Sequence, residues 1–500
     1  MRLSLPTRIP LPQVFVFASV FFCVQQIEHT DLYFSMLYFG FLILSVVAFN
    51  FAGGFSRVTG AYVFWYSTLI VIVGVTWKAV LGEPADSNLL NPLLDMALYT
   101  SSMVMLLLIV LLNRKMDFRA MGIGGGFSKA ELNYTAAGLG CIVVWLTIIY
   151  SVWIFGNASG GVVSALTQVN VFGSLGIILL TIGAVKDSGG RRSVSMISIA
   201  VFVYFEYLGL GAYSKQAMIT PMVCWAVGVF YARLRVRLIH VVAIIAMGLL
   251  SFGFISPLSA SRDLAEDLDT DGHVVFAWYL FTHPSVLHEH IKQIQVTKDM
   301  GVAEYYDVPQ GSLIERLSMI PPDDELFAYS VKGHYEGMTP IYQYFSNLMP
   351  HFLNPDKQVT FSGNYYAHEM GAGLSEEDYS TGISFSPVGE AFHCEGWGGI
   401  LWLLPLIWIL LFSTVDFVVG DMTKYPWGLM VVVWLAHAAP EQLVAGMIYF
   451  IGYGNFGMAL AIIVVTRIAP ILGSLFLGRT PMPSGRRLAG ARPIVAQARG

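Results

Sequence analysis

The sequence predicts an all-α polytopic membrane protein with about twelve transmembrane helices and a large, partly helical extracytoplasmic loop before the last three spans. Composition supports this fold class, because 55% of the 500 residues are apolar and only 12% are charged. Apolar runs long enough to cross the hydrocarbon of a bilayer recur along the chain. One polar segment, from about Ser259 to Glu395, interrupts them.

The predicted spans are helices rather than strands, because each must satisfy its own backbone hydrogen bonds in lipid. They cover about residues 11–26, 32–51, 60–77, 96–112, 134–154, 166–185, 194–213, 217–233, 239–257, 400–419, 426–440 and 443–466. The chain then divides into an N-terminal membrane domain of about nine helices, the large loop, the C-terminal membrane helices and a cytoplasmic tail that we expect to be disordered. These regions are residues 1–258, 259–395, 396–470 and 471–500.

Lysine and arginine indicate the orientation, because they concentrate in the cytoplasmic loops of membrane proteins. With the N-terminus in the cytoplasm, 20 of the 28 basic residues fall in cytoplasmic segments. The short outer loops then keep only Lys78 and Lys215. The sequence therefore predicts that both termini are cytoplasmic and that the large loop lies outside the membrane.

The large loop is strongly acidic, with 21 acidic residues against six basic ones. Such a surface repels nucleic acid and anionic head groups, so no nucleic-acid partner is expected. A site for a sugar phosphate or pyrophosphate would need some of the few basic side chains. These are Arg262, Lys292, Lys298, Arg316, Lys332 and Lys357.

No metal and no cofactor are predicted from the sequence. The segment Asp267–Gly272 resembles the opening of a calcium loop, but its twelfth position is Trp278 instead of a bidentate carboxylate. His288 and His290 lie two residues apart, a poor spacing for zinc on a helix.

Three stretches together resemble the bacterial oligosaccharide repeat unit polymerases, the O-antigen polymerase (Wzy-type) family. They are Gly211–Lys215 at the outer end of a span, Asn347–Lys357 inside the loop, and Ser386–Phe392 followed by Gly396–Gly399. Their order along the chain also matches the family. One departure is His351, which stands where the family pattern has arginine.

The resemblance implies an integral-membrane glycosyltransferase in the bacterial inner membrane. Such an enzyme transfers a growing glycan from polyprenyl pyrophosphate onto a lipid-linked repeat unit at the outer face. A chain-length regulator and a flippase are the implied protein partners, and membrane lipid surrounds the chain.

The same resemblance suggests roles for individual residues. The leaving pyrophosphate needs positive neighbours, for which we expect Lys215, Arg262, Arg316, His351 and Lys357. The attacking sugar hydroxyl needs a base or an orienting acceptor, for which Glu390 is the first candidate and His393 the second.

Two other functions fit the sequence. An O-antigen ligase has the same layout and donor but a different acceptor. A transporter or lipid flippase belongs to another class, although we find no repeat symmetry in the sequence and the polar residues concentrate outside the bilayer.

Overall fold

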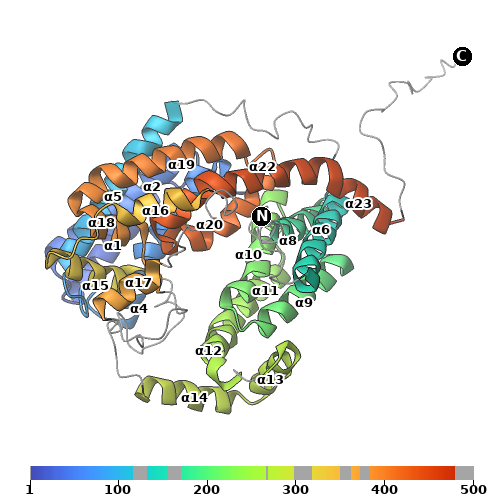
Figure 1. Cartoon of the computed structure of the whole chain (residues 1–500), viewed down its shortest axis with the longest axis horizontal. Coiled ribbons are helices and arrows are strands. Elements are labelled where there is room, and N and C mark those ends of the chain that lie inside the picture. Colours follow the sequence, from blue (N-terminus) through green and yellow to red (C-terminus); the bar gives the residue numbers. More distant parts are fainter. Residues whose placement is uncertain are drawn as a thin grey trace, which may run out of the picture.

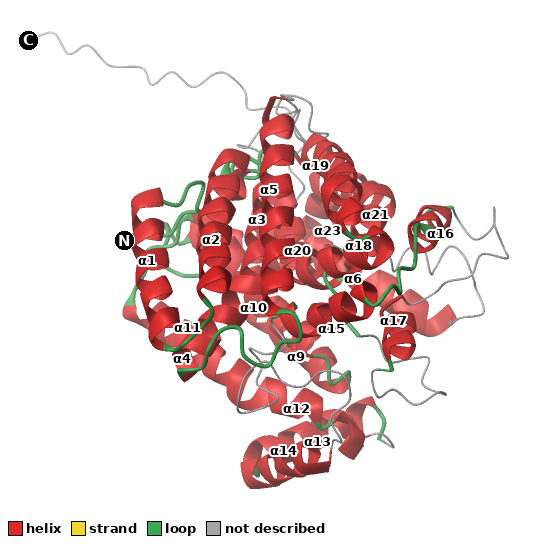
Figure 2. Ribbon diagram, turned by 90° about the vertical axis from the view of Figure 1, so that its left-hand side faces the viewer, coloured by secondary structure: helices red, strands yellow, loops and turns green. Residues whose placement is uncertain are grey.

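The computed structural model describes residues 2–115, 132–155, 171–265, 268–297, 318–349, 362–371 and 383–478. These residues form helices and connecting loops, without a β-strand (Figure 2). Two isolated bridges, Arg2 with Arg235 and Phe385 with Gln442, are the only ladder-type contacts among them. The predicted all-α class is therefore confirmed for the described part of the chain.

The helices before the large loop coincide with the predicted apolar runs. They are α1 (Leu11–Ile27), α2 (Leu32–Ala52), η1 (Gly54–Ser56), α3 (Val58–Ser67), η2 (Thr68–Ile72), α4 (Val73–Leu81), α5 (Pro92–Lys115), α6 (Tyr134–Phe155), α8 (Phe172–Asp187), α9 (Met196–Gly211), α10 (Lys215–Ala232), α11 (Leu238–Leu250) and η5 (Ser251–Ile255).

The described part of the region predicted as a large loop contains several helices, and the chain then returns to long apolar helices. The loop region holds α12 (Ser256–Ala260), η6 (Arg262–Ala265), α13 (Thr270–Thr282), α14 (Pro284–Thr297), α15 (Ile320–Val331), α16 (Thr339–Asn347), α17 (Ser362–Met370) and α18 (Pro387–Glu395). The last helices are η8 (Gly399–Leu403), α19 (Leu404–Val419), η9 (Pro426–Gly428), α20 (Leu429–Glu441), α21 (Leu443–Tyr449), η10 (Phe450–Gly454), α22 (Asn455–Ile463), η11 (Val464–Ile468) and α23 (Ala469–Phe476).

Within the described residues, seven helical segments are long and apolar enough to cross a membrane. They are Leu32–Ser56, Val58–Leu81, Pro92–Lys115, Tyr134–Val152, Leu238–Ser259, Gly399–Val419 and Leu443–Phe476. Two shorter apolar helices, α1 and α9, accompany them. These findings support a membrane protein, whereas the total of twelve spans and the orientation remain predictions.

The helices of the large loop pack in two separate places. Helices α13 and α14 lie with α12 beyond the ends of α9 and α10 (Figure 1), where Leu258, Ala277 and Leu287 share one apolar cluster with Tyr213. Helices α15 to α18 lie on the other side of the molecule, where α15 packs on α5 and α18 packs on α21. The second group contains the Gly-Glu segment that the sequence singled out.

Two glycines bring α6 and α23 into close contact. A Cβ atom on Gly140 would collide with the carbonyl oxygen of Ala469, and one on Gly473 would collide with that of Ala136. Small residues allow such close backbone approach between apolar helices, where packing supplies much of the attraction. This contact holds the last helix of the described chain against the N-terminal membrane domain.

We expect Gly140→Ala and Gly473→Ala each to destabilise the protein by about 1–3 kcal/mol, because the added methyl group forces the two backbones apart. Gly40→Ala is the matched control, since a Cβ atom there meets nothing within 4 Å and alanine favours a helix. Thermal unfolding of the purified protein in detergent measures the effect. Equal melting temperatures for all three variants would contradict the close approach.

Candidate functional site

Helix α18 carries the Gly-Glu segment and has well-defined ends. The side chain of Ser386 caps its start, accepting hydrogen bonds from the amides of Val388 and Gly389 at 3.1 Å each. Pro387 follows at the first helical position, where no amide donor is needed. The helix ends at Gly396, whose φ of 55° suits glycine.

Glu390 lies in the middle of α18 with its side chain fully buried. Its Oε1 accepts hydrogen bonds from the hydroxyls of Tyr344, on α16, and Tyr366, on α17; the Tyr366 bond is 2.9 Å long. Its Oε2 accepts a 2.6 Å bond from the amide of Val444. Burial raises the pKa of Glu390, and the hydrogen bonds from Tyr344, Val444 and Tyr366 oppose that rise. The carboxylate therefore joins four helices.

The amide of Val444 can donate to a side chain because the helical backbone is interrupted between α20 and α21. Pro440 lies in the last turn of α20, and Leu443 adopts a φ of 55°, which is unfavourable for a branched side chain. The first amides of α21 consequently lack partners within their own helix. Glu390 satisfies the amide of Val444, and an oxygen acceptor at this position suits the positive end of the helix dipole.

A second buried carboxylate, Asp323 on α15, holds the start of α18. It accepts hydrogen bonds from the amide of Ser386 at 2.9 Å, from the Ser386 hydroxyl, and from the Tyr99 hydroxyl at 2.7 Å. Burial raises the pKa of Asp323 to about 6, against the lowering effect of these donors. Position 389 must be glycine, because a Cβ atom there would collide with Asp323 Oδ1.

The neighbouring Asp324 serves a different helix. Its two carboxylate oxygens accept hydrogen bonds from the amides of Leu90 at 2.5 Å and Asn91 at 2.9 Å, just before α5 begins. A carboxylate at a helix start satisfies free amides and complements the helix dipole. The adjacent pair Asp323 and Asp324 therefore fastens α15 to both α18 and α5.

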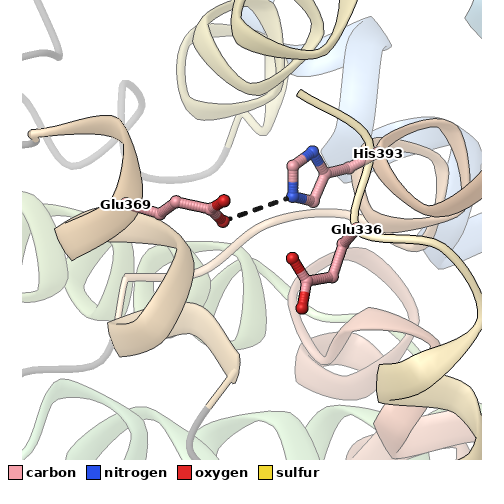
Figure 3. Close-up of side chains that lie close together, drawn as sticks. All are labelled: Glu336, Glu369 and His393. Carbon is pink, nitrogen blue, oxygen red and sulfur yellow. Dashed lines mark ion pairs between the residues drawn. The ribbon is translucent and has the colours of Figure 1, made fainter. Parts of the chain in front are cut away.

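Three further side chains lie close together (Figure 3), and one of them, His393, is on the same helix as Glu390. His393 comes from α18, Glu369 from α17, and Glu336 from the turn between α15 and α16. One nitrogen or oxygen atom of each lies within 4.8 Å of the others, an arrangement that could hold a metal ion. Burial lowers the pKa of His393 to about 4, with a further contribution from His334, so the imidazole is neutral at neutral pH.

The residues predicted to bind pyrophosphate do not gather around Glu390 in the described structure. Lys215 begins α10, directly after the helix cap Ser214, and its neighbours Tyr213 and Met218 share the apolar cluster of α12 to α14 instead. Arg262 lies in η6, where only its backbone is described. Arg316, His351 and Lys357 lie outside the described residues. Their proposed roles stay predictions, as do those of Glu390 and His393.

Sequence reasoning missed several members of this centre. Asp323, Glu336 and Glu369 gave no recognisable spacing, because they come from three separate elements of a region without a known pattern. The tandem acids directly after Pro321-Pro322 were the one available signal, since such a pair is typical of a helix start.

Within the described residues, the fold is that of an all-helical membrane protein in which helices α15 to α18 surround a buried carboxylate centre. Comparisons with family models, curated proteins and solved structures found no match. The function must therefore be argued from the residues themselves and from the resemblance of the three sequence stretches.

We expect Ser386→Ala to lower the free energy of unfolding by more than an ordinary loss of a helix cap, which costs about 0.5–2 kcal/mol. The substitution also removes a donor from the buried Asp323, which adds about 1–3 kcal/mol. Ser195→Ala is the control, because Ser195 caps α9 through Ser198 without contacting a carboxylate. Denaturation in detergent compares them, and equal losses would argue against the Asp323 contact.

Proposed function

We propose that this chain is an integral-membrane glycosyltransferase that polymerises a surface polysaccharide. It would transfer a growing glycan from polyprenyl pyrophosphate onto a lipid-linked repeat unit at the outer face of the bacterial inner membrane. The observation that carries the proposal is the convergence of the Gly-Glu segment with helices of the large loop. Glu390 joins α16 and α17 to α18 directly before the span Gly399–Val419.

This location suits a substrate whose head group is held at a membrane by a lipid. The polar centre is formed by loop helices α15 to α18, which adjoin the spans that begin at Pro92, Gly399 and Leu443. A lipid-linked saccharide presents its sugar and pyrophosphate at the same boundary. Exposed aromatic side chains on these loop helices, Tyr335, Tyr342 and Tyr365, offer faces on which sugars can pack.

The proposed reaction forms a bond between an acceptor sugar hydroxyl and the anomeric carbon of the donor glycan. The bond from that carbon to the lipid pyrophosphate breaks, and the hydroxyl proton passes to a base or to water. Glu390 already accepts hydrogen bonds from Tyr344, Tyr366 and the amide of Val444, so we propose that it orients the two tyrosines beside the acceptor. The residues proposed to stabilise the charge of the leaving group are Lys215, Arg262, Arg316, His351 and Lys357. Lys215 lies apart from Glu390, at the start of α10, so its role requires a bound donor that reaches both places.

Glu390→Gln should abolish long polysaccharide chains while leaving the protein in the membrane. The amide group of glutamine places a donor against the hydroxyl and amide donors that the carboxylate accepts, which disturbs α16, α17 and α21. A gel of surface glycan and lipid-linked intermediates should show at least tenfold less polymer with single repeat units still made.

Glu289→Gln is the control for that experiment, because Glu289 is an exposed carboxylate on α14 of the same loop. Wild-type chain lengths from Glu390→Gln would remove Glu390 from the mechanism. A deletion strain with normal lipid-linked polymer but no transfer to its final carrier would instead favour an O-antigen ligase.

Lys215→Ala should weaken use of the pyrophosphate donor by about tenfold to a hundredfold, the range expected for losing a hydrogen bond to a charged group of about 1.5–3 kcal/mol. The apparent KM for a lipid-linked donor, measured with purified protein in detergent, tests this. Lys292→Ala is the control, since Lys292 is an exposed base on α14. Unchanged donor use in Lys215→Ala would place the pyrophosphate elsewhere.

A further inference from the structure

His393 points an unpartnered nitrogen at a carboxylate. Its side chain is fully buried, and within the described part of the chain Nε2 has no hydrogen-bond partner. The nearest carboxylate oxygen, Oε2 of Glu369, lies 3.6 Å away and also has no hydrogen-bond partner among these residues (Figure 3). Buried polar atoms in native proteins are normally paired, so these two atoms require an explanation.

The other ring nitrogen determines which atom of His393 carries the hydrogen. Nδ1 lies 2.9 Å from Oγ of Ser330, and the Ser330 hydroxyl donates its hydrogen to the carbonyl oxygen of Leu326 at 2.6 Å. Nδ1 must then donate to Ser330, because a hydroxyl has only one hydrogen. In the neutral ring, Nε2 consequently carries a lone pair. A lone pair that faces a carboxylate oxygen is repulsive unless a proton or a metal cation lies between them, and the third ligand atom, from Glu336, favours the metal.

We propose that Glu336, Glu369 and His393 bind one divalent transition-metal cation, for which Zn²⁺ is the best match. The donor set is one imidazole nitrogen and carboxylate oxygens, which Zn²⁺ accepts and which is less suited to Mg²⁺ or Ca²⁺. Two ligand atoms at zinc-ligand distances on a tetrahedron lie about 3.4 Å apart. The observed 3.6 Å between Nε2 and Oε2 is close to that separation.

The surrounding residues hold the three ligands in place. The turn that carries Glu336 is fastened to α18, because the amides of Glu336 and Gly337 donate to the carbonyl oxygens of His393 and Cys394 at 3.0 and 3.1 Å. Tyr365 donates to Glu336 Oε1 at 3.4 Å. The Nδ1 hydrogen bond of His393 to Ser330 is the kind of outer contact that orients a metal-binding imidazole.

Electrostatics also favour a cation at this position. Glu336 and Glu369 place two carboxylates beside the imidazole of His393, with one ligand atom of each residue within 4.8 Å of the others. Two carboxylates beside a neutral imidazole therefore repel one another, and a divalent cation would convert this repulsion into attraction. Glu369 is 27% exposed, which gives solvent access to the remaining coordination position.

This inference goes beyond the proposed function and does not depend on it. Three protein ligands leave at least one position for water or for an oxygen of a bound molecule. The site would also fasten α17 and the α15–α16 turn to α18. Metal content and affinity can be measured without any assay of polysaccharide synthesis, so failure of one proposal does not imply failure of the other.

The test uses full-length protein purified in detergent, stripped of metal and titrated with Zn²⁺ alone. We expect one equivalent to bind and to raise the melting temperature, since a ligand that binds the folded state stabilises it. Glu369→Gln and Glu336→Gln should each weaken Zn²⁺ binding at least tenfold. Both side chains are partly exposed, so these variants should fold even if His393→Gln does not.

Glu395→Gln is the matched control, because Glu395 is an exposed carboxylate on the same helix, two residues from His393. It should bind Zn²⁺ as the wild type does. Absence of Zn²⁺ binding by the wild type would overturn the proposal, as would equal affinity in all variants.

Co²⁺ provides a spectroscopic check on the ligands. Coordination by nitrogen and oxygen gives weak visible bands, whereas a thiolate ligand adds an intense charge-transfer band in the near ultraviolet. Cys394 follows His393 directly and is a buried cysteine outside any disulfide, so it is the thiol that must be excluded as a metal ligand. The proposal predicts visible bands without the thiolate band, and an intense thiolate band would overturn it.

Discussion

The buried carboxylate of Glu390 is the interaction on which the arrangement of helices α16, α17, α18 and α21 depends. Leaving a buried charge without its partners costs several kcal/mol, so α16, α17 and the start of α21 must keep their donors directed at this one group. One of these donors, the amide of Val444, is available because the helix is interrupted just after Pro440. A left-handed residue at Leu443 stores strain at the same break, which is typical of functional segments.

Asp323 and Asp324 extend this arrangement to the N-terminal membrane domain. Adjacent residues on a helix face different directions, so one carboxylate reaches Tyr99 and the start of α18 while the other caps α5. Polar contacts of this kind fix the orientation of α15 relative to α5 and α18, which apolar packing alone specifies poorly. Gly389 completes the contact by leaving room for Asp323. Gly389 is thus needed to leave room for Asp323, whereas Glu390 is needed to accept hydrogen bonds from α16, α17 and α21.

Much of the fold could be predicted from the sequence. The length of an apolar run and the need for backbone hydrogen bonds within each span do not depend on tertiary contacts. The Gly-Glu segment was also identified, but its partners were not. Tyr344 and Tyr366 stood among many aromatic residues of the loop, and the ligand-type trio of Glu336, Glu369 and His393 is assembled from three separate elements. Neither arrangement leaves a fixed spacing in the sequence, since folding alone brings these side chains together.

The central claim is that one carboxylate fastens α16, α17 and α21 to α18, and amide hydrogen exchange tests it most directly. The measurement compares wild type with the double variant Tyr344→Phe/Tyr366→Phe, with Tyr342→Phe as a control because Tyr342 is 69% exposed. Our account predicts faster exchange in α16, α17 and the first turn of α21 together, because the carboxylate loses two of its donors. Exchange rates equal to those of the wild type in all three helices would contradict it.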